Sequence, residues 1–272
     1  MSVRLENLTV RHLAATPDAA PALTGLELSI APGEQLALIG PSGAGKTTLL
    51  ATLACAHRPA SGTFTVFGED PWALSQATRH RLRARLFLAP QTPPLPPRQR
   101  VVTSVLAARL PHMSLWQAFA SLVKPSDPDA AHAALSRFGL GDKLYARVDR
   151  LSGGERQRCG LARLLLSSAD VLLVDEPISA LDPTLAQHTL NTLQNEAQAR
   201  GALLVCSLHQ VEMARAHFPR LVGLRAGRIV FDLPREAVTD AMIAALYDNE
   251  HVEPHHDKPH ESPDRIAVGA CF

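Results

Sequence analysis

The sequence predicts an α/β fold with a mostly parallel sheet, an N-terminal antiparallel β-subdomain and a helical insertion. In the second half of the chain, apolar runs of strand length, "VLLVDEP", "ALLVCSLH" and "RLVGLRAG", alternate with helix-length segments, which is typical of a buried parallel sheet. The N-terminal part contains short alternating runs such as "VRLENLTV" and "LELSI", which predict strands. Between these parts, residues 102–147 have helical apolar spacing in "SVLAARL", "LWQAFASLV" and "AAHAALSRFGL".

The remaining elements follow in chain order. A Pro/Ala-rich connection spans residues 14–22, the strand "QLALIG" leads through a loop into a helix, and the strand "TFTVFG" follows. After "LFLAP" comes the proline-dense segment "PQTPPLPPRQR". Proline lacks an N–H donor and fixes φ, so this segment is expected to be a surface loop or hinge. The last stretch, residues 253–272, is polar, rich in Pro and His, and predicted to be disordered.

The predicted organisation is one domain over residues 1–250 and a disordered His/Pro-rich tail over residues 251–272. A helical subdomain at about residues 92–158 lies within the domain, which suits a chain of 272 residues. Four tail histidines raise the alternative of a metal site: His251, His255, His256 and His260. The tail is broken by prolines and nothing fixes a tetrahedral geometry, so a solvated tail is the preferred interpretation.

Bulk composition excludes several classes of protein. The 27 Lys and Arg balance the 26 Asp and Glu, so no overall basic field favours nucleic acid as a partner. The apolar runs are shorter than the roughly 20 residues of a membrane-spanning helix, and the N-terminus lacks a secretory signal, so a cytoplasmic location is expected. Four scattered cysteines without a CxxC pair are interpreted as mostly buried reduced thiols: Cys55, Cys159, Cys206 and Cys271.

The loop "GPSGAGKT" matches the motif G-x-x-x-x-G-K-[ST], after a predicted strand and at the start of a predicted helix. Glycines let the backbone N–H groups converge on phosphate oxygens, and the start of the helix adds unpaired N–H groups. Lys46 is predicted to reach the β- and γ-phosphates, and the Thr47 hydroxyl to hold Mg²⁺. A P-loop NTPase core that binds a nucleoside triphosphate follows. Its predicted binding residues are Gly40, Pro41, Ser42, Gly43, Ala44, Gly45, Lys46, Thr47 and Thr48.

The apolar strand "VLLVDE" supplies the acids that such a loop requires. Asp175 is the candidate Mg²⁺ ligand through water, and Glu176 is the candidate for polarising an attacking water. A strand that ends in two solvated acids is the alternative, which the presence of the P-loop makes much less favourable.

The stretch "LSGGERQR" suggests a second anion site. Ser152 and Glu155 fit a capping box for the helix that follows, but capping does not explain Gly153 and Gly154. Bare N–H groups at a helix start bind anions. Because one phosphate cradle is already present, the second suggests the same nucleotide contacted from another subunit.

In order and approximate spacing, these motifs resemble the ATP-binding-cassette (ABC) ATPases. The resemblance covers about residues 2–248 and includes the "SALD" loop at residues 179–182 and His209 in "SLHQ". It implies a head-to-tail homodimer in which Ser152, Gly153 and Gly154 of one copy meet the ATP held by the P-loop of the other. It also implies two integral-membrane permease subunits, a periplasmic or extracellular substrate-binding protein, and a location on the cytoplasmic face of the inner membrane.

The resemblance assigns further roles position by position. Gln91 matches the glutamine that senses Mg²⁺ and the attacking water, so it joins Thr47 and Asp175 as a metal-site candidate. His209 matches the switch histidine at the γ-phosphate and, with Glu176 and Gln91, completes the catalytic set. Asp182 would organise the subunit interface. His12 occupies the place of the aromatic residue that stacks on adenine.

Several stretches resemble more specifically the ATPase subunits of phosphonate importers. They are "VLAARLPHMSLWQAF", "DEPISALDP", "LHQVEMA", "VGLRAGRIVFD" and the terminal "LYDNE" after a short helix. The resulting hypothesis is a transport-coupled ATPase that uses ATP and Mg²⁺ to energise import of phosphonates or related phosphorus compounds. The alternatives are the ATPase of another importer or of an exporter, a soluble ABC ATPase acting on ribosomes or DNA, and a degraded cassette that only binds ATP.

Overall fold

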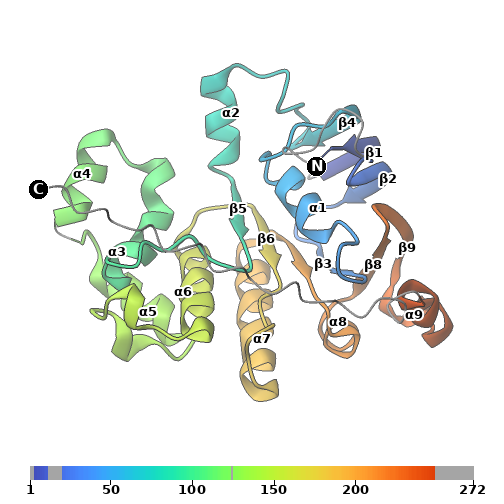
Figure 1. Cartoon of the computed structure of the whole chain (residues 1–272). Coiled ribbons are helices and arrows are strands. Elements are labelled where there is room, and N and C mark those ends of the chain that lie inside the picture. The colour runs from blue at the N-terminus through green and yellow to red at the C-terminus, as the bar shows by residue number, and fades with distance from the viewer. Residues whose placement is uncertain (1–2, 12–19, 124, 249–272) are drawn as a thin grey trace, which may run out of the picture.

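The computed structural model describes residues 3–11, 20–123 and 125–248, and its strands form two sheets (Figure 1). The larger sheet has the order β5-β6-β7-β3-β8-β9, and the smaller one has the order β2-β1-β4. The strands are β1 (Val3–Val10), β2 (Leu23–Ile30), β3 (Gln35–Ile39), β4 (Ser61–Val66), β5 (Leu86–Ala89), β6 (Val171–Asp175), β7 (Leu203–Ser207), β8 (Arg220–Arg225) and β9 (Arg228–Pro234).

The larger sheet is mostly parallel, as predicted. β5, β6, β7, β3 and β8 all pair in parallel, and only β9 runs antiparallel to its neighbour β8. β6 and β7 are buried at every position because helices or the small sheet cover both faces. In the parallel register Asp175 of β6 lies opposite Ser207 of β7, at the carboxyl ends of both strands.

The smaller sheet is antiparallel, which confirms the predicted N-terminal β-subdomain. β1 lies between β2 and β4 and pairs antiparallel with both. Val3, Leu5, Leu8 and Val10 of β1 are buried toward the larger sheet, and a register shift between Leu5 and Leu8 interrupts the strict alternation of its side chains.

Helices lie on both faces of the larger sheet and in a separate group beside it (Figure 1). The α-helices are α1 (Lys46–Leu53), α2 (Gln76–Arg83), α3 (Val101–Leu106), α4 (Leu115–Val123), α5 (Pro128–Ser136), α6 (Gly153–Leu166), α7 (Pro183–Arg200), α8 (Val211–His217) and α9 (Asp240–Tyr247). The 3₁₀ helices are η1 (Ala107–His112), η2 (Gly141–Lys143), η3 (Val148–Arg150) and η4 (Arg235–Ala237).

Two hydrophobic cores share the central strand. Leu36 and Leu38 of β3 pack in the core that contains α1 and the small sheet. Ala37 and Ile39 of the same strand face the second core, which contains the helices α6, α7 and α8. The side chains of a strand alternate between faces, so one apolar strand contributes to both cores.

The predicted helical insertion is present, with one local difference. α3 ends at Leu106 and the chain continues as the 3₁₀ helix η1, although "SVLAARL" predicts one α-helix. Pro111 has no N–H to donate, and its ring would clash with the carbonyl of Ala107 in an α-helix. The proline-dense segment before α3 contains no helix or strand, as expected.

The C-terminal helix extends further than the sequence analysis expects. The sequence analysis places "LYDNE" after a short helix, but Leu246 and Tyr247 form the last turn of α9. Leu246 is buried in the core that contains α6, α7 and α8, which explains why the helix continues through this residue. Among the residues that the structure describes, no helix combines the length and apolarity of a membrane span.

Candidate functional site

The loop that connects β3 to α1 has the shape that its glycines predict. Gly40, Gly43 and Gly45 all have positive φ. A Cβ atom at Gly40 would lie 2.0 Å from the carbonyl oxygen of Leu224, so only glycine fits there. No side chain caps the start of α1, which leaves the first N–H groups of this helix directed toward the loop. Such a helix start attracts anions.

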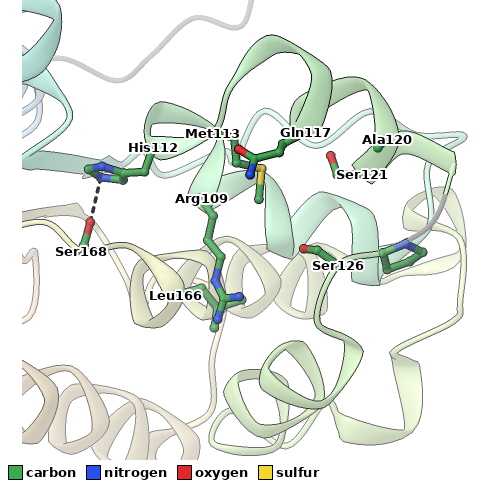
Figure 2. A pocket seen from close by; sticks show the side chains of 10 residues that line it. Arg109, His112, Met113, Gln117, Ala120, Ser121, Ser126, Leu166 and Ser168 are labelled. Carbon is green, nitrogen blue, oxygen red and sulfur yellow. Dashed lines mark hydrogen bonds between the residues drawn. The ribbon is translucent and has the colours of Figure 1, made fainter.

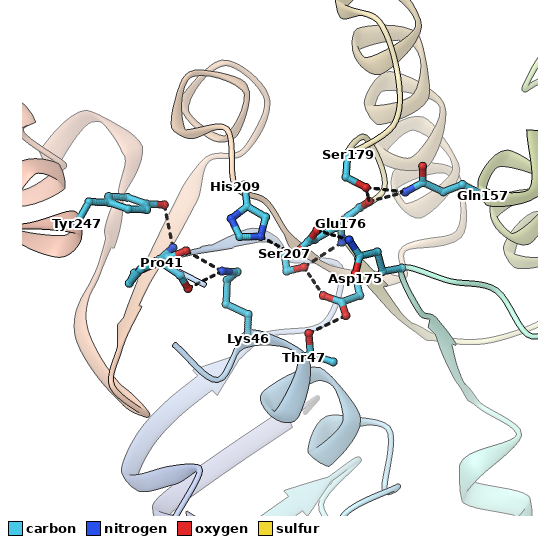
Figure 3. A network of polar contacts seen from close by, with 12 residues as sticks. Pro41, Lys46, Thr47, Gln157, Asp175, Glu176, Ser179, Ser207, His209 and Tyr247 are labelled. Atoms are coloured by element: carbon cyan, nitrogen blue, oxygen red, sulfur yellow. Dashed lines mark hydrogen bonds and ion pairs between the residues drawn. The ribbon is translucent and has the colours of Figure 1, made fainter. Parts of the chain in front are cut away.

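The side chain of Lys46 lies over this loop (Figure 3). Its Nζ atom donates hydrogen bonds to the carbonyl oxygens of Gly40, at 2.6 Å, and Pro41, at 3.0 Å. The side chain is buried, so the ammonium group is held close to the loop backbone. A fixed cation and converging N–H groups can together bind a polyphosphate.

Asp175 ends β6 beside the start of α1. Its Oδ2 atom accepts a hydrogen bond from the Thr47 hydroxyl at 2.8 Å, and its Oδ1 atom accepts one from the Ser207 hydroxyl at 2.5 Å. The carboxylate is buried. It is therefore fixed between α1 and the end of β7, with its oxygens next to the glycine-rich loop.

Glu176 is the centre of a second set of contacts at the same edge of the sheet (Figure 3). Its Oε2 atom accepts a hydrogen bond from Gln91 Nε2 at 2.7 Å, and its Oε1 atom lies 2.5 Å from His209 Nε2. The backbone of Glu176 has a φ of 49°, a left-handed conformation that costs about 1 kcal/mol or more for a non-glycine residue. Its N–H donates to the Ser207 hydroxyl, which stabilises this turn. Each oxygen of the Glu176 carboxylate is thus held by one side-chain partner.

The structure brings most of the predicted site residues to one cavity. This cavity, of about 330 Å³, is lined by residues 42–48 of the loop together with Glu176 and His209. Asp175 and Gln91 adjoin it through their hydrogen bonds to Thr47 and Glu176. The phosphate-binding loop, the acids and the histidine therefore surround one space that can hold a phosphate chain.

The predicted second anion site does not line this cavity. Ser152 and Glu155 form the predicted capping box of α6, in which each side chain accepts a hydrogen bond from the other residue's N–H. The hydrogen bond from the Ser152 N–H lowers the pKa of the Glu155 carboxyl. A Cβ atom at Gly153 would meet no atom within 4 Å, so packing within the described chain does not require a glycine there.

Three further residues hold the site in place, and the sequence analysis does not identify them. Ser207 lies opposite Asp175 in the parallel register, so comparing the ends of neighbouring strands could have found it. Gln157, one turn into α6, donates to the carbonyl oxygen of Glu176 at 2.6 Å. Tyr247 accepts a hydrogen bond from the Gly40 N–H at 3.1 Å from a helix 207 positions later in the chain, which no local pattern indicates.

Other predicted residues have different outcomes. Asp182 caps α7 by accepting a hydrogen bond from the Leu185 N–H at 3.0 Å. Cys55, Cys159 and Cys206 are buried free thiols, as expected, and burial raises the pKa of the first two to about 12. His12, the residues of the tail and Cys271 lie outside the described residues.

The fold and site together define a class of protein. A glycine-rich loop between a strand and a helix that begins at a lysine, with an acid at the end of a neighbouring strand, is the nucleotide site of a P-loop NTPase. The sequence profile described as "ABC transporter" matches residues 23–179, and the chain belongs to that family.

Similar proteins support this family, and solved structures share the fold. The chain is 59% identical over 247 residues, 91% of this chain and 89% of the relative, to "Phosphonates import ATP-binding protein PhnC 2" of Albidiferax ferrireducens. It is 52% identical to the protein of the same name in Pseudomonas aeruginosa over 100% of both chains. Among solved structures, the dimeric ATP-binding cassette MJ0796 with ADP and Pi matches with a TM-score of 0.72 at 24% identity, over 86% of this chain and 98% of that one.

Proposed function

We propose that this chain is the ATP-hydrolysing subunit that energises a membrane importer of phosphonates or related phosphorus compounds. The observation that carries the proposal is the 59% identity, over nearly all of both chains, to a relative named for phosphonate import. The cavity beside the P-loop supports the ATPase part of the proposal, since Glu176 and His209 face the space where a triphosphate would end. A cassette that only binds ATP is disfavoured by this complete set of polar groups.

ATP would lie with its phosphates in the loop from residue 40 to residue 48. The N–H groups at the start of α1 and the Lys46 ammonium would contact the β- and γ-phosphates. Lys46 donates to two loop carbonyls, which supports a position of its ammonium group beside the phosphates. His12, by the family resemblance, would stack on the adenine.

The residues next to the loop suit Mg²⁺. The Thr47 hydroxyl and the Asp175 carboxylate, 2.8 Å apart, are oxygen donors of the kind that Mg²⁺ prefers, and Gln91 would add its amide oxygen. Bound there, Mg²⁺ would neutralise charge that develops on the phosphates during hydrolysis. The Ser207 hydroxyl would keep the carboxylate oriented, because it already donates to the other oxygen.

Glu176 would orient the water that attacks the γ-phosphate. Its two oxygens contact Gln91 and His209, so the carboxylate is already fixed at the edge of the cavity. With ATP bound, one oxygen would accept a hydrogen bond from the attacking water, and the His209 imidazole would contact the γ-phosphate. Gln157 would hold the backbone of Glu176 in place through its carbonyl oxygen.

Two copies of the chain would complete two sites. Ser152, Gly153 and Gly154 do not reach the cavity of their own chain, and Gly153 leaves space for a group that approaches from outside. A partner copy, packed head to tail, would bring its γ-phosphate to these N–H groups, and Asp182 would lie near the interface. ATP binding would then close the dimer and hydrolysis would reopen it.

The proposed assembly includes further subunits. Two permease subunits would contact Gln91 and the segment from Thr92 to Arg109 at the start of the helical subdomain, which spans about residues 92–158, and a substrate-binding protein would deliver the phosphonate. The ATPase domain would span residues 1–250 and work on the cytoplasmic face of the inner membrane. The tail, residues 251–272, would take no part in catalysis.

A growth experiment tests this function. A strain that lacks the gene is expected to grow on phosphate but not on a phosphonate as sole phosphorus source. The wild-type gene should restore growth on the phosphonate, whereas the Glu176→Gln variant, expressed at the same level, should not. Growth of the deletion strain on every phosphonate, with no second importer encoded, would reject the substrate and leave the ATPase assignment to be tested separately by hydrolysis.

A further inference from the structure

Helix α4 exposes large apolar side chains to solvent. The exposed fractions are 83% for Leu115, 82% for Trp116 and 68% for Phe119. The spacing of these residues places them on one side of the helix. Large apolar residues grouped on one exposed surface mark an interaction site more often than chance.

The described side chains of α4 that border the rest of the protein are small or polar. Gln117, Ala120 and Ser121 line a cavity of about 730 Å³ that separates α4 from Leu166 and Ser168 at the end of α6 (Figure 2). Gln117, Ala120 and Ser121 thus lie on the side of α4 that borders this cavity, whereas Leu115, Trp116 and Phe119 are exposed to solvent. A helix that packs on its own domain has the opposite arrangement. The apolar side is therefore suited to something outside the chain.

The sequence around α4 has an unusual charge distribution. Between Asp70 and Asp127 the chain contains no Asp or Glu, although the whole sequence is nearly neutral. The cations of this segment are Arg79, Arg81, Arg83, Arg85, Arg98, Arg100, Arg109 and Lys124. Arg85 pairs with Asp170 and Arg109 with Asp127, and the segment still has an excess of positive charge. Figure 1 shows two helices of this segment, α2 near the top centre and α4 at the left. The partner is therefore expected to be negatively charged.

We propose that α4 places Leu115, Trp116 and Phe119 into the headgroup region of a membrane that contains anionic lipids. Leucine, phenylalanine and tryptophan on one side of a helix insert at the boundary between headgroups and acyl chains, and nearby Lys and Arg add attraction to anionic lipids. α4 itself has no charged residue. A segment with charges of one sign suits a uniformly negative surface better than a protein interface, where both signs commonly alternate. The proposal does not depend on the transported substrate.

The chain contains a built-in reporter for the test. It has two tryptophans, Trp72 and Trp116, so a Trp72→Phe background leaves Trp116 as the single source of tryptophan emission. The purified full chain would be mixed with vesicles of phosphatidylcholine and phosphatidylglycerol, or of phosphatidylcholine alone. The expected result is a shift of emission to shorter wavelength and co-sedimentation with the anionic vesicles, both reduced by high salt.

Variants distinguish insertion of α4 into the membrane from nonspecific adsorption to vesicles. Leu115→Ser combined with Phe119→Ser is expected to weaken vesicle binding by more than about tenfold, because two apolar contacts are lost. Val230→Ser, which removes an exposed apolar side chain on β9, is the matched control and should bind like the parent. Unchanged melting temperature and ATP hydrolysis of the double variant would show that it is folded.

Three outcomes would overturn the proposal. The first is the absence of an emission shift on anionic vesicles. The second is vesicle binding by the double serine variant equal to that of the parent. The third is a shift that occurs with the detergent-solubilised permease and not with vesicles, which would assign this face to a protein partner.

Discussion

The two glycine-rich segments of the molecule differ in what packs against them. At Gly40 of the P-loop a Cβ atom would lie 2.0 Å from the Leu224 carbonyl oxygen, whereas at Gly153 a Cβ atom would meet no atom within 4 Å. The first glycine is required by the chain's own β8, and the second is not required by any described neighbour. The shape of the P-loop is thus fixed by packing within one chain, whereas the proposed second half of the nucleotide site, at residues 152–154, is open at Gly153.

The largest effect is expected at Glu176, which belongs to the part of the nucleotide site that a single chain forms. Glu176→Gln should lower the rate of ATP hydrolysis by about 10²–10⁴-fold, because an amide orients and activates water poorly. The variant should still bind ATP and accumulate as an ATP-bound dimer, which gel filtration with ATP would detect. Glu212→Gln, an exposed position on α8, is the control. Hydrolysis at the wild-type rate, or a variant that stays monomeric with ATP, would contradict the assignment.

A matched pair of alanine variants tests the comparison directly. Gly40→Ala should lower the free energy of unfolding by about 3 kcal/mol, because the new methyl group clashes with backbone at a strained φ. Gly153→Ala should change it by less than about 0.5 kcal/mol, since the position is open and alanine suits a helix.

The pair should separate stability from activity. Urea unfolding would measure the free energy of unfolding of each variant, and an ATP hydrolysis assay would measure its activity. Gly153→Ala should lose most hydrolysis although it is stable, because its methyl group would occupy the space left for the partner's phosphate. A Gly153→Ala variant with normal hydrolysis, or equal destabilisation in both variants, would remove the distinction between the two segments.

A smaller effect is expected at Tyr247, which holds the P-loop from behind. Tyr247→Phe removes the acceptor for the Gly40 N–H. A hydrogen bond of this kind contributes about 1 kcal/mol, so ATP affinity should fall by about fivefold. The other tyrosine of the chain, Tyr145, is exposed, and Tyr145→Phe is the control. Calorimetric titration with ATP would measure both, and equal affinities would show that Tyr247 does not position the loop.

The smallest effect concerns the capping box at the start of α6. The Ser152 N–H lowers the pKa of Glu155 in the folded protein, so this carboxylate stabilises the fold above the ordinary pKa of glutamate. That contribution is lost as the pH falls through the lowered folded-state pKa. Wild type should therefore exceed Glu155→Gln in unfolding free energy by about 0.5 kcal/mol near neutral pH, and the difference should vanish in acid. A difference that is independent of pH would contradict this cause.

The sequence predicts those parts of the fold and site that are encoded locally. The spacing of Gly40, Gly45 and Lys46 fixes a loop, and the apolar run before Asp175 fixes a strand, so both could be identified before the structure was known. Tyr247 could not, since its contact with Gly40 depends on how a distant helix packs. The orientation of α4 could not be predicted either, because its apolar spacing indicates a helix but not which side faces the protein.

The strand order has a consequence for how the chain is made. β3 lies between β7 and β8 in the sheet, yet β3 ends at Ile39 and β7 begins at Leu203. At the usual speed of protein synthesis the ribosome needs on the order of 10 s to make the residues between them. During that time the apolar strand in front of the P-loop has neither of its neighbours, so the nascent chain must be kept from aggregating until β7 and β8 emerge.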